Sequence, residues 1–147
     1  NWFNIGEVST TPPADGLLAV WDTSGLDGVY TVELTVEQEG GARERAVVQV
    51  RVDNIPPSVI LNAGEAGKVY RWPSETIIPL SADVRDNLAI DRVEFYNTGR
   101  LLFTDTEAPY TFDYAITGVG VMTFSVVAYD SAGNRNASTD VSVEVTR

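Results

Sequence analysis

The chain has 147 residues, of which 44% are hydrophobic and 21% are charged, a balance typical of folded domains and not of disordered acidic tails. Its 21 acidic and 10 basic residues give a net charge of -11, and the basic residues are scattered singly, which excludes a basic patch for nucleic acid. With no cysteine, no histidine and no apolar run near the roughly 18 residues of a bilayer span, the sequence predicts no thiolate or imidazole chemistry, no zinc site and no membrane insertion.

The beginning of the chain is rich in large apolar side chains. Trp2, Phe3 and Ile5 form one cluster, and residues 17–22 predict a short strand that carries Trp21. These side chains are too many to be covered by the few strands around them, so we expect them to need a further packing partner.

A β-hairpin is predicted next. Residues 30–36 and 46–52 alternate apolar and polar side chains, and Gly40-Gly41 between them predicts a turn. Alternation with period two places one set of side chains on the core face and the other set in water. The predicted core face consists of Tyr30, Val32, Leu34, Val36, Ala46, Val48, Val50 and Val52.

Residues 1–54 therefore supply about four strands, whereas an immunoglobulin-like sandwich needs about seven. We interpret them as a partial domain, completed by residues upstream in a longer parent, by the second domain or by another chain. Because open strand edges are templates for another chain, we expect self-association through residues 1–54, as a homodimer. The apolar set that drives it is Trp2, Phe3, Ile5, Trp21, Tyr30 and Val48.

Pro56 and Pro57 mark a domain boundary, because each proline removes a backbone donor and forces the preceding residue into an extended or turn conformation. We assign residues 1–54 to the partial domain and residues 55–147 to a complete immunoglobulin-like β-sandwich. The second domain is predicted to be free of helices, with strands at 58–61, 68–70, 76–84, 91–96, 101–104, 110–114, 121–130 and 138–146. Its predicted core includes Leu80, Phe95, Phe124, Val126 and Val143.

Six short stretches resemble bacterial immunoglobulin-like or fibronectin III-like repeats. In the first part they are residues 16–23 (GLLAVWDT), 26–34 (LDGVYTVEL) and 52–57 (VDNIPP); in the second part they are 93–96 (VEFY) with Gly99, 108–110 (APY) and 128–134 (AYDSAGN). This pairing of two repeat types is similar to the C-terminal tails of class A penicillin-binding proteins, the bifunctional peptidoglycan glycosyltransferases and transpeptidases. Comparable repeats also accompany secreted proteases, glycosidases and adhesins.

The resemblance implies a non-catalytic, extracytoplasmic interaction or spacer module of a bacterial envelope protein, with peptidoglycan or envelope proteins as partners. The residues agree that this chain is not an enzyme. A penicillin-binding acyl-transfer site needs Ser-x-x-Lys, whereas the only lysine is Lys68, and the residue three positions before it is Glu65. Chance pairs of carboxylates are expected among 21 acidic residues, so they do not indicate glycoside hydrolysis.

Asp53, Asp86 and Asp130 fall at the ends of predicted strands, where a linker and two loops meet at one pole of the sandwich. Their carboxylates are hard oxygen ligands, which predicts a Ca²⁺ site. The alternative is turn chemistry, since Asp side chains at strand ends accept hydrogen bonds from the local backbone.

Tyr70 and Trp72 predict an aromatic platform on which a sugar ring could stack, with Trp72 the more exposed because it lies in the turn-like Arg71-Trp72-Pro73-Ser74. The runner-up function is accordingly a carbohydrate-binding module for peptidoglycan. The alternative is that both aromatic rings pack in or around the core.

Overall fold

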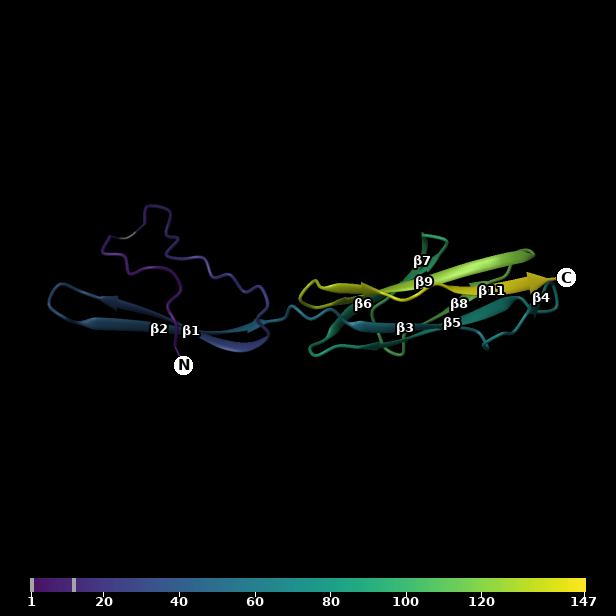
Figure 1. Cartoon of the computed structure of the whole chain (residues 1–147), viewed down its shortest axis with the longest axis horizontal. Helices are drawn as coiled ribbons and strands as arrows, with labels where there is room; N and C mark the ends of the chain where they lie inside the picture. The colour runs from purple at the N-terminus through teal and green to yellow at the C-terminus, as the bar shows by residue number, and fades with distance from the viewer. Residues whose placement is uncertain (1, 12) are drawn as a thin grey trace. The chain divides into compact units, whose positions relative to one another are not determined.

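The computed structural model describes residues 2–11 and 13–147, and every regular element within them is a β-strand (Figure 1). The prediction of an all-β, helix-free fold is confirmed for these residues. None of the described segments is a helix long and apolar enough to cross a membrane. The chain divides into two compact units, residues 1–54 and residues 55–147, and each is described by itself below.

The first unit contains a two-stranded antiparallel sheet made of β1 (Gly28–Glu37) and β2 (Arg43–Val52). In its register Tyr30 lies opposite Val50 and Val32 lies opposite Val48. Because directly opposite residues share a face, this register brings the predicted apolar side chains together on one face of the hairpin. The predicted hairpin is confirmed, with both strands a few residues longer than the alternation indicated.

The predicted strand at residues 17–22 is wrong, because this segment is irregular in the structure. The carboxylates of Asp15 and Asp22 accept hydrogen bonds from the amides of Leu17 and Ser24, and these local turns bracket the segment. Among the described residues no strand pairs with it, so its backbone has no ladder to join. The indole of Trp21 holds the segment instead.

Trp21 is the centre of an aromatic row that lies against one end of the hairpin. Its ring centroid is 5.2 Å from that of Tyr30, in an edge-to-face arrangement, and 6.3 Å from that of Phe3. Aromatic pairs at these separations are favourable beyond their buried area. These aromatic contacts therefore hold the irregular segment at residues 17–22 against β1.

The second unit is a sandwich of two sheets (Figure 1). The three-stranded sheet has the order β3-β5-β8, and the larger sheet has the order β4-β11-β9-β6-β7, with β10 paired to the side of β9. The strands are β3 (Ser58–Ala63), β4 (Tyr70–Arg71), β5 (Ile77–Arg85), β6 (Ile90–Asn97), β7 (Arg100–Asp105), β8 (Thr111–Ala115), β9 (Gly120–Asp130), β10 (Arg135–Ala137) and β11 (Val141–Thr146). All eight predicted strands are present, and the three-residue β10 was not predicted.

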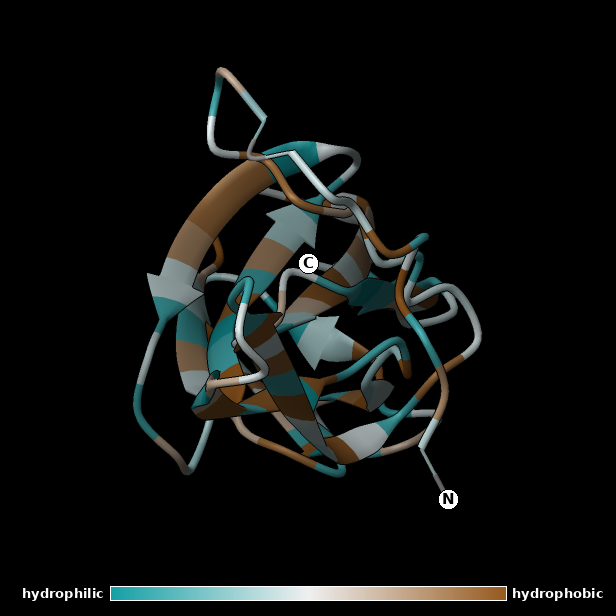
Figure 2. Cartoon of the chain, turned by 90° about the vertical axis from the view of Figure 1, so that its left-hand side faces the viewer, coloured by the Kyte–Doolittle hydropathy of each residue, from teal (hydrophilic) through white to brown (hydrophobic). Residues whose placement is uncertain are grey.

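The core of the sandwich lies between the two sheets and consists of the residues that the alternation selects. Leu80, Phe95, Phe124, Val126 and Val143 are all buried, as predicted. Apolar and polar residues follow one another in bands along the strands of the chain (Figure 2). Inward residues of one sheet meet those of the other, which is how a sandwich removes both apolar faces from water.

Candidate functional site

The topology of the sandwich explains why Asp86 and Asp130 come together. Ser58, the first residue of β3, pairs with Arg85, so the chain that enters β3 runs beside the end of β5, where Asp86 follows. Ile90, the first residue of β6, pairs with Asp130, the last residue of β9. Strand ends that pair in this way lie at the same pole, together with the loops that follow them.

Asp130 is buried, with 2% of its surface exposed, and its carboxylate organises the turn that follows β9. Its Oδ1 accepts hydrogen bonds from the backbone amides of Ala132 at 2.9 Å and Asn134 at 2.8 Å. Its Oδ2 accepts one from the side-chain amide of Asn134 at 2.8 Å. These contacts are the turn chemistry expected of an Asp at a strand end.

Asp86 is half-buried, and its two carboxylate oxygens differ in their hydrogen bonding. Oδ2 accepts a hydrogen bond from the amide of Leu88 at 2.9 Å, whereas Oδ1 is shielded from solvent and has no hydrogen-bond partner among the described residues. A buried carboxylate oxygen in this state is costly unless a cation or a donor reaches it.

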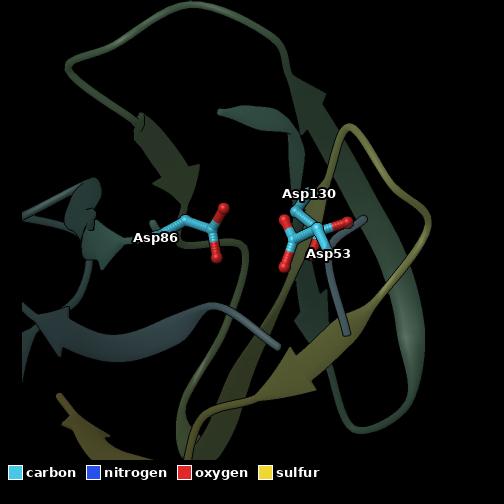
Figure 3. A group of neighbouring side chains, drawn as sticks. All are labelled: Asp53, Asp86 and Asp130. Carbon is cyan, nitrogen blue, oxygen red and sulfur yellow. The ribbon is translucent and has the colours of Figure 1, made fainter. Parts of the chain in front are cut away.

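The structure brings two of the predicted ligands together within the second unit. Asp86 and Asp130 each offer a carboxylate oxygen, and these oxygens lie within 4.8 Å of each other (Figure 3). Negative charges at this spacing repel each other, and a divalent cation between them would turn that repulsion into attraction. Carboxylate oxygens are the donors that Ca²⁺ prefers. Asp53 belongs to the first unit, so its part in the site stays a prediction.

The predicted sugar platform has a different environment. Tyr70 is buried at 3% exposure, with its phenol group beneath Gly64, so its ring does not face solvent. Trp72 is half-buried and packs against the edge of the core. Of these two aromatic rings, only the outer side of Trp72 is therefore available for a sugar to stack on.

Lys68 lies beside two shallow depressions, of about 490 Å³ and 240 Å³, that flank the loop at residues 64–69. Its Nζ is 2.9 Å from a carboxylate oxygen of Glu75 and 4.6 Å from the ring centroid of Tyr70. The hydrogen bond to Glu75 raises the pKa of Lys68 above its ordinary value. This environment favours the charged ammonium, whereas a lysine that activates a nucleophile must be neutral.

An ordered network on the outer face of β6 and β9 was not predicted from the sequence. Arg92 donates to Glu94 at 2.8 Å and to Asp91 at 2.8 Å, and its guanidinium lies 3.7 Å above the ring of Tyr129. The hydroxyl of Tyr96 donates to Glu94 at 2.6 Å, and this hydrogen bond raises the pKa of Tyr96 to about 12. The only signal in the sequence is that these side chains alternate with core residues.

The comparisons with known proteins agree with the β-sandwich fold of the second unit. Residues 57–146 match the family described as bacterial Ig domain. The chain is also similar to a solved structure of the fibronectin(III)-like modules of Clostridium thermocellum CbhA, with 32% sequence identity and a TM-score of 0.55 over 60% of this chain and 96% of that chain. No curated protein matches the chain. Because the family covers more than half of its length and the sandwich has the expected two sheets, the chain belongs to the bacterial Ig domain family.

Proposed function

We propose that this chain is a non-catalytic, extracytoplasmic interaction or spacer module of a bacterial cell-envelope protein. The observation that carries the proposal is the bacterial Ig sandwich itself, whose interior is filled by packed side chains such as Phe95 and Phe124. Domains of this kind present surfaces and set distances, whereas function on such folds has to be argued from individual sites.

We propose further that the parent protein is a class A penicillin-binding peptidoglycan glycosyltransferase, of which this chain is a C-terminal accessory region. The support is the resemblance of the motifs at residues 16–23, 26–34 and 52–57 in one unit, and at 93–96 and 128–134 in the other. A repeat of an adhesin or a secreted hydrolase is the alternative parent. A peptidoglycan-binding module is the alternative role, and it depends on Trp72.

Co-sedimentation of the purified chain with peptidoglycan sacculi, together with labelling by a fluorescent penicillin, tests the proposed role. We expect no covalent labelling and no saturable retention on sacculi, because the only lysine is held by Glu75 and Tyr70 is buried. Covalent labelling would show that the chain has catalytic chemistry. Saturable retention that is lost in Trp72→Ala and kept in Trp2→Ala, a control at a tryptophan exposed to 70%, would favour the carbohydrate-binding role.

A second candidate function is Ca²⁺ binding at Asp53, Asp86 and Asp130. Two observations favour it: the carboxylate oxygens of Asp86 and Asp130 lie within 4.8 Å of each other, and Oδ1 of Asp86 is buried with no hydrogen-bond partner among the described residues. The hydrogen bonds of Asp130, and the one that Asp86 accepts from the amide of Leu88, already explain two of the three residues as turn formers. Extracellular modules bind Ca²⁺ with dissociation constants of about 10⁻⁴–10⁻³ M, which is the range we propose here.

Thermal unfolding with Ca²⁺, with Mg²⁺ and with a chelator tests this second function. At 10 mM, about 10 to 100 times the proposed dissociation constant, bound Ca²⁺ adds about 1.4–2.7 kcal/mol to the free energy of unfolding, so it should raise the melting temperature measurably. Asp86→Asn should remove this increment without lowering the stability in chelator, since Asn still accepts from the amide of Leu88 and the repulsion between the carboxylates is relieved. Asp140→Asn, at an exposed position, is the control. A wild-type chain whose melting temperature is the same in chelator and in 10 mM Ca²⁺ (about ten times the weaker of these constants) would leave turn formation as the only role of these carboxylates.

A further inference from the structure

The apolar face of the hairpin in the first unit is only partly covered. We call it the hairpin face; it consists of Gly28, Tyr30, Val32, Leu34 and Val36 of β1 and Glu44, Ala46, Val48, Val50 and Val52 of β2. Trp21 packs on Tyr30 at one end, but Leu34, Val36 and Val48 remain exposed at 43%, 51% and 56%. Among the described residues of this unit, Val52 alone is buried. A two-stranded sheet without a covered face is marginally stable in water.

We infer that the hairpin face binds the hairpin face of a second copy of this chain. The distribution of charge supports this occupant. Of the ten positions on the hairpin face only Glu44 is charged, whereas the opposite face carries five charged side chains. Two copies that each have a net charge of -11 repel each other, and a nearly uncharged face is where they can approach without burying charge. The charged side chains of the opposite face are Glu33, Glu37, Arg43, Arg45 and Arg51.

The same charges disfavour particular registers of a dimer built by joining strand edges around a two-fold axis. An antiparallel pair of two β1 strands centred on Thr35 would place Glu33 opposite Glu37 of the second copy. An antiparallel pair of two β2 strands centred on Val47 would place Arg43 opposite Arg51. Like charges directly opposite each other destabilise a sheet. Within one copy these side chains are instead balanced across the hairpin, by Arg43–Glu37 at 3.0 Å and Arg45–Glu33 at 3.5 Å.

Face-to-face packing keeps the two remaining charges apart. Sheets stack about 10 Å apart, and a two-fold axis that crosses the strands at the Leu34–Ala46 pair brings the exposed halves of the two faces together. Glu44 is two residues from this axis, or about 7 Å along the strand, so the two copies of Glu44 point to opposite ends of the contact. Their separation exceeds the screening length of about 8 Å at physiological salt.

The size of the face sets the strength of the association. Three aliphatic side chains expose about half of their surface, and Phe3, beside Trp21, exposes 61%. This area is smaller than the roughly 800 Å² per partner of a standard stable complex. We therefore expect a weak dimer that dissociates on dilution, with a dissociation constant between about 10 μM and 1 mM. The inference rests on the proposed role as an interaction module.

Sedimentation velocity across a dilution series tests the inference, with a matched pair of variants. Leu34 lies on the hairpin face at the proposed axis and is exposed to 43%, whereas Val47 lies on the opposite face and is exposed to 53%. We expect Leu34→Lys to raise the dissociation constant at least tenfold, because each dimer would bury two ammonium groups that face each other at the axis, and Val47→Lys, which lies opposite Glu33, to change it less than about threefold. Both variants change the net charge equally. A wild-type chain that is monomeric at about 1 mM, or equal effects of the two variants, would overturn the inference.

Cross-linking gives a second measurement that does not depend on how Leu34→Lys folds. The chain has no cysteine, so one introduced cysteine is the only reactive thiol. We expect a short bis-maleimide to link Ala46→Cys, near the proposed axis, into dimers, and to leave Val47→Cys mainly monomeric. Equal dimer yields would overturn the inference. Neither measurement uses peptidoglycan or metal, so failure here is distinguishable from failure of the proposed envelope role.

Discussion

Replacing Phe124 by Ala should lower the free energy of unfolding of the sandwich by about 3–5 kcal/mol. The side chain is fully buried between the sheets, and its ring meets that of Tyr114 edge to face, with centroids 4.9 Å apart. Removing it leaves a cavity that the two sheets close only in part, so packing is lost together with the transfer free energy of the ring. Urea unfolding followed by circular dichroism measures the difference.

The control for this variant lies on the same strand. Val121 is on β9 and is exposed to 67%, so Val121→Ala should change the stability by no more than about 0.5 kcal/mol. A loss below about 1 kcal/mol for Phe124→Ala would mean that the two sheets do not enclose this ring as described.

Asp130→Ala should cost about 2–4 kcal/mol in the presence of a chelator. The carboxylate accepts three hydrogen bonds, from the amides of Ala132 and Asn134 and from the side chain of Asn134, and alanine replaces none of them. Hydrogen bonds to a charged acceptor are stronger than neutral ones, and the donors left behind are partly buried. Thermal or urea unfolding in chelator isolates this contribution from any effect of a bound metal.

Two further variants separate the hydrogen bonds of Asp130 from its charge. Asp130→Asn keeps one carbonyl oxygen for the two backbone amides and loses the acceptor for the side chain of Asn134, so about half of the alanine effect should remain. Asp140→Ala, at an exposed position, should be nearly neutral. An alanine variant at position 130 that is as stable as the wild type would contradict the role assigned to this turn.

The sandwich core was predictable because its signal is local. Phe124 and Val126 alternate with polar or outward residues along one strand, and period-two alternation specifies which side chains face the other sheet. The strand at residues 17–22 was mispredicted because the signal is only local. An apolar segment has the pattern of a strand whether or not a partner strand is available to pair with its backbone. The three residues of β10 are too few to carry any period.

The candidate metal site was predictable in its residues and not in its geometry. Asp53, Asp86 and Asp130 stand out as Asp residues next to strand ends, which is visible in the sequence. The distance between the oxygens of Asp86 and Asp130 depends on long-range register, in particular on the pairs Ser58–Arg85 and Ile90–Asp130. The stacking of Arg92 on Tyr129 depends on register in the same way, because the two residues belong to different strands.

The placement of the tryptophans gives each unit its own optical reporter. Trp2 and Trp21 belong to the first unit, and Trp72 packs against the core of the sandwich. The chain has three tryptophans in all, so the tryptophan emission of a Trp72→Phe variant comes only from the first unit, and that of a variant with both Trp2 and Trp21 replaced comes only from the second. The melting of each unit can thus be followed separately in the intact chain without any attached dye.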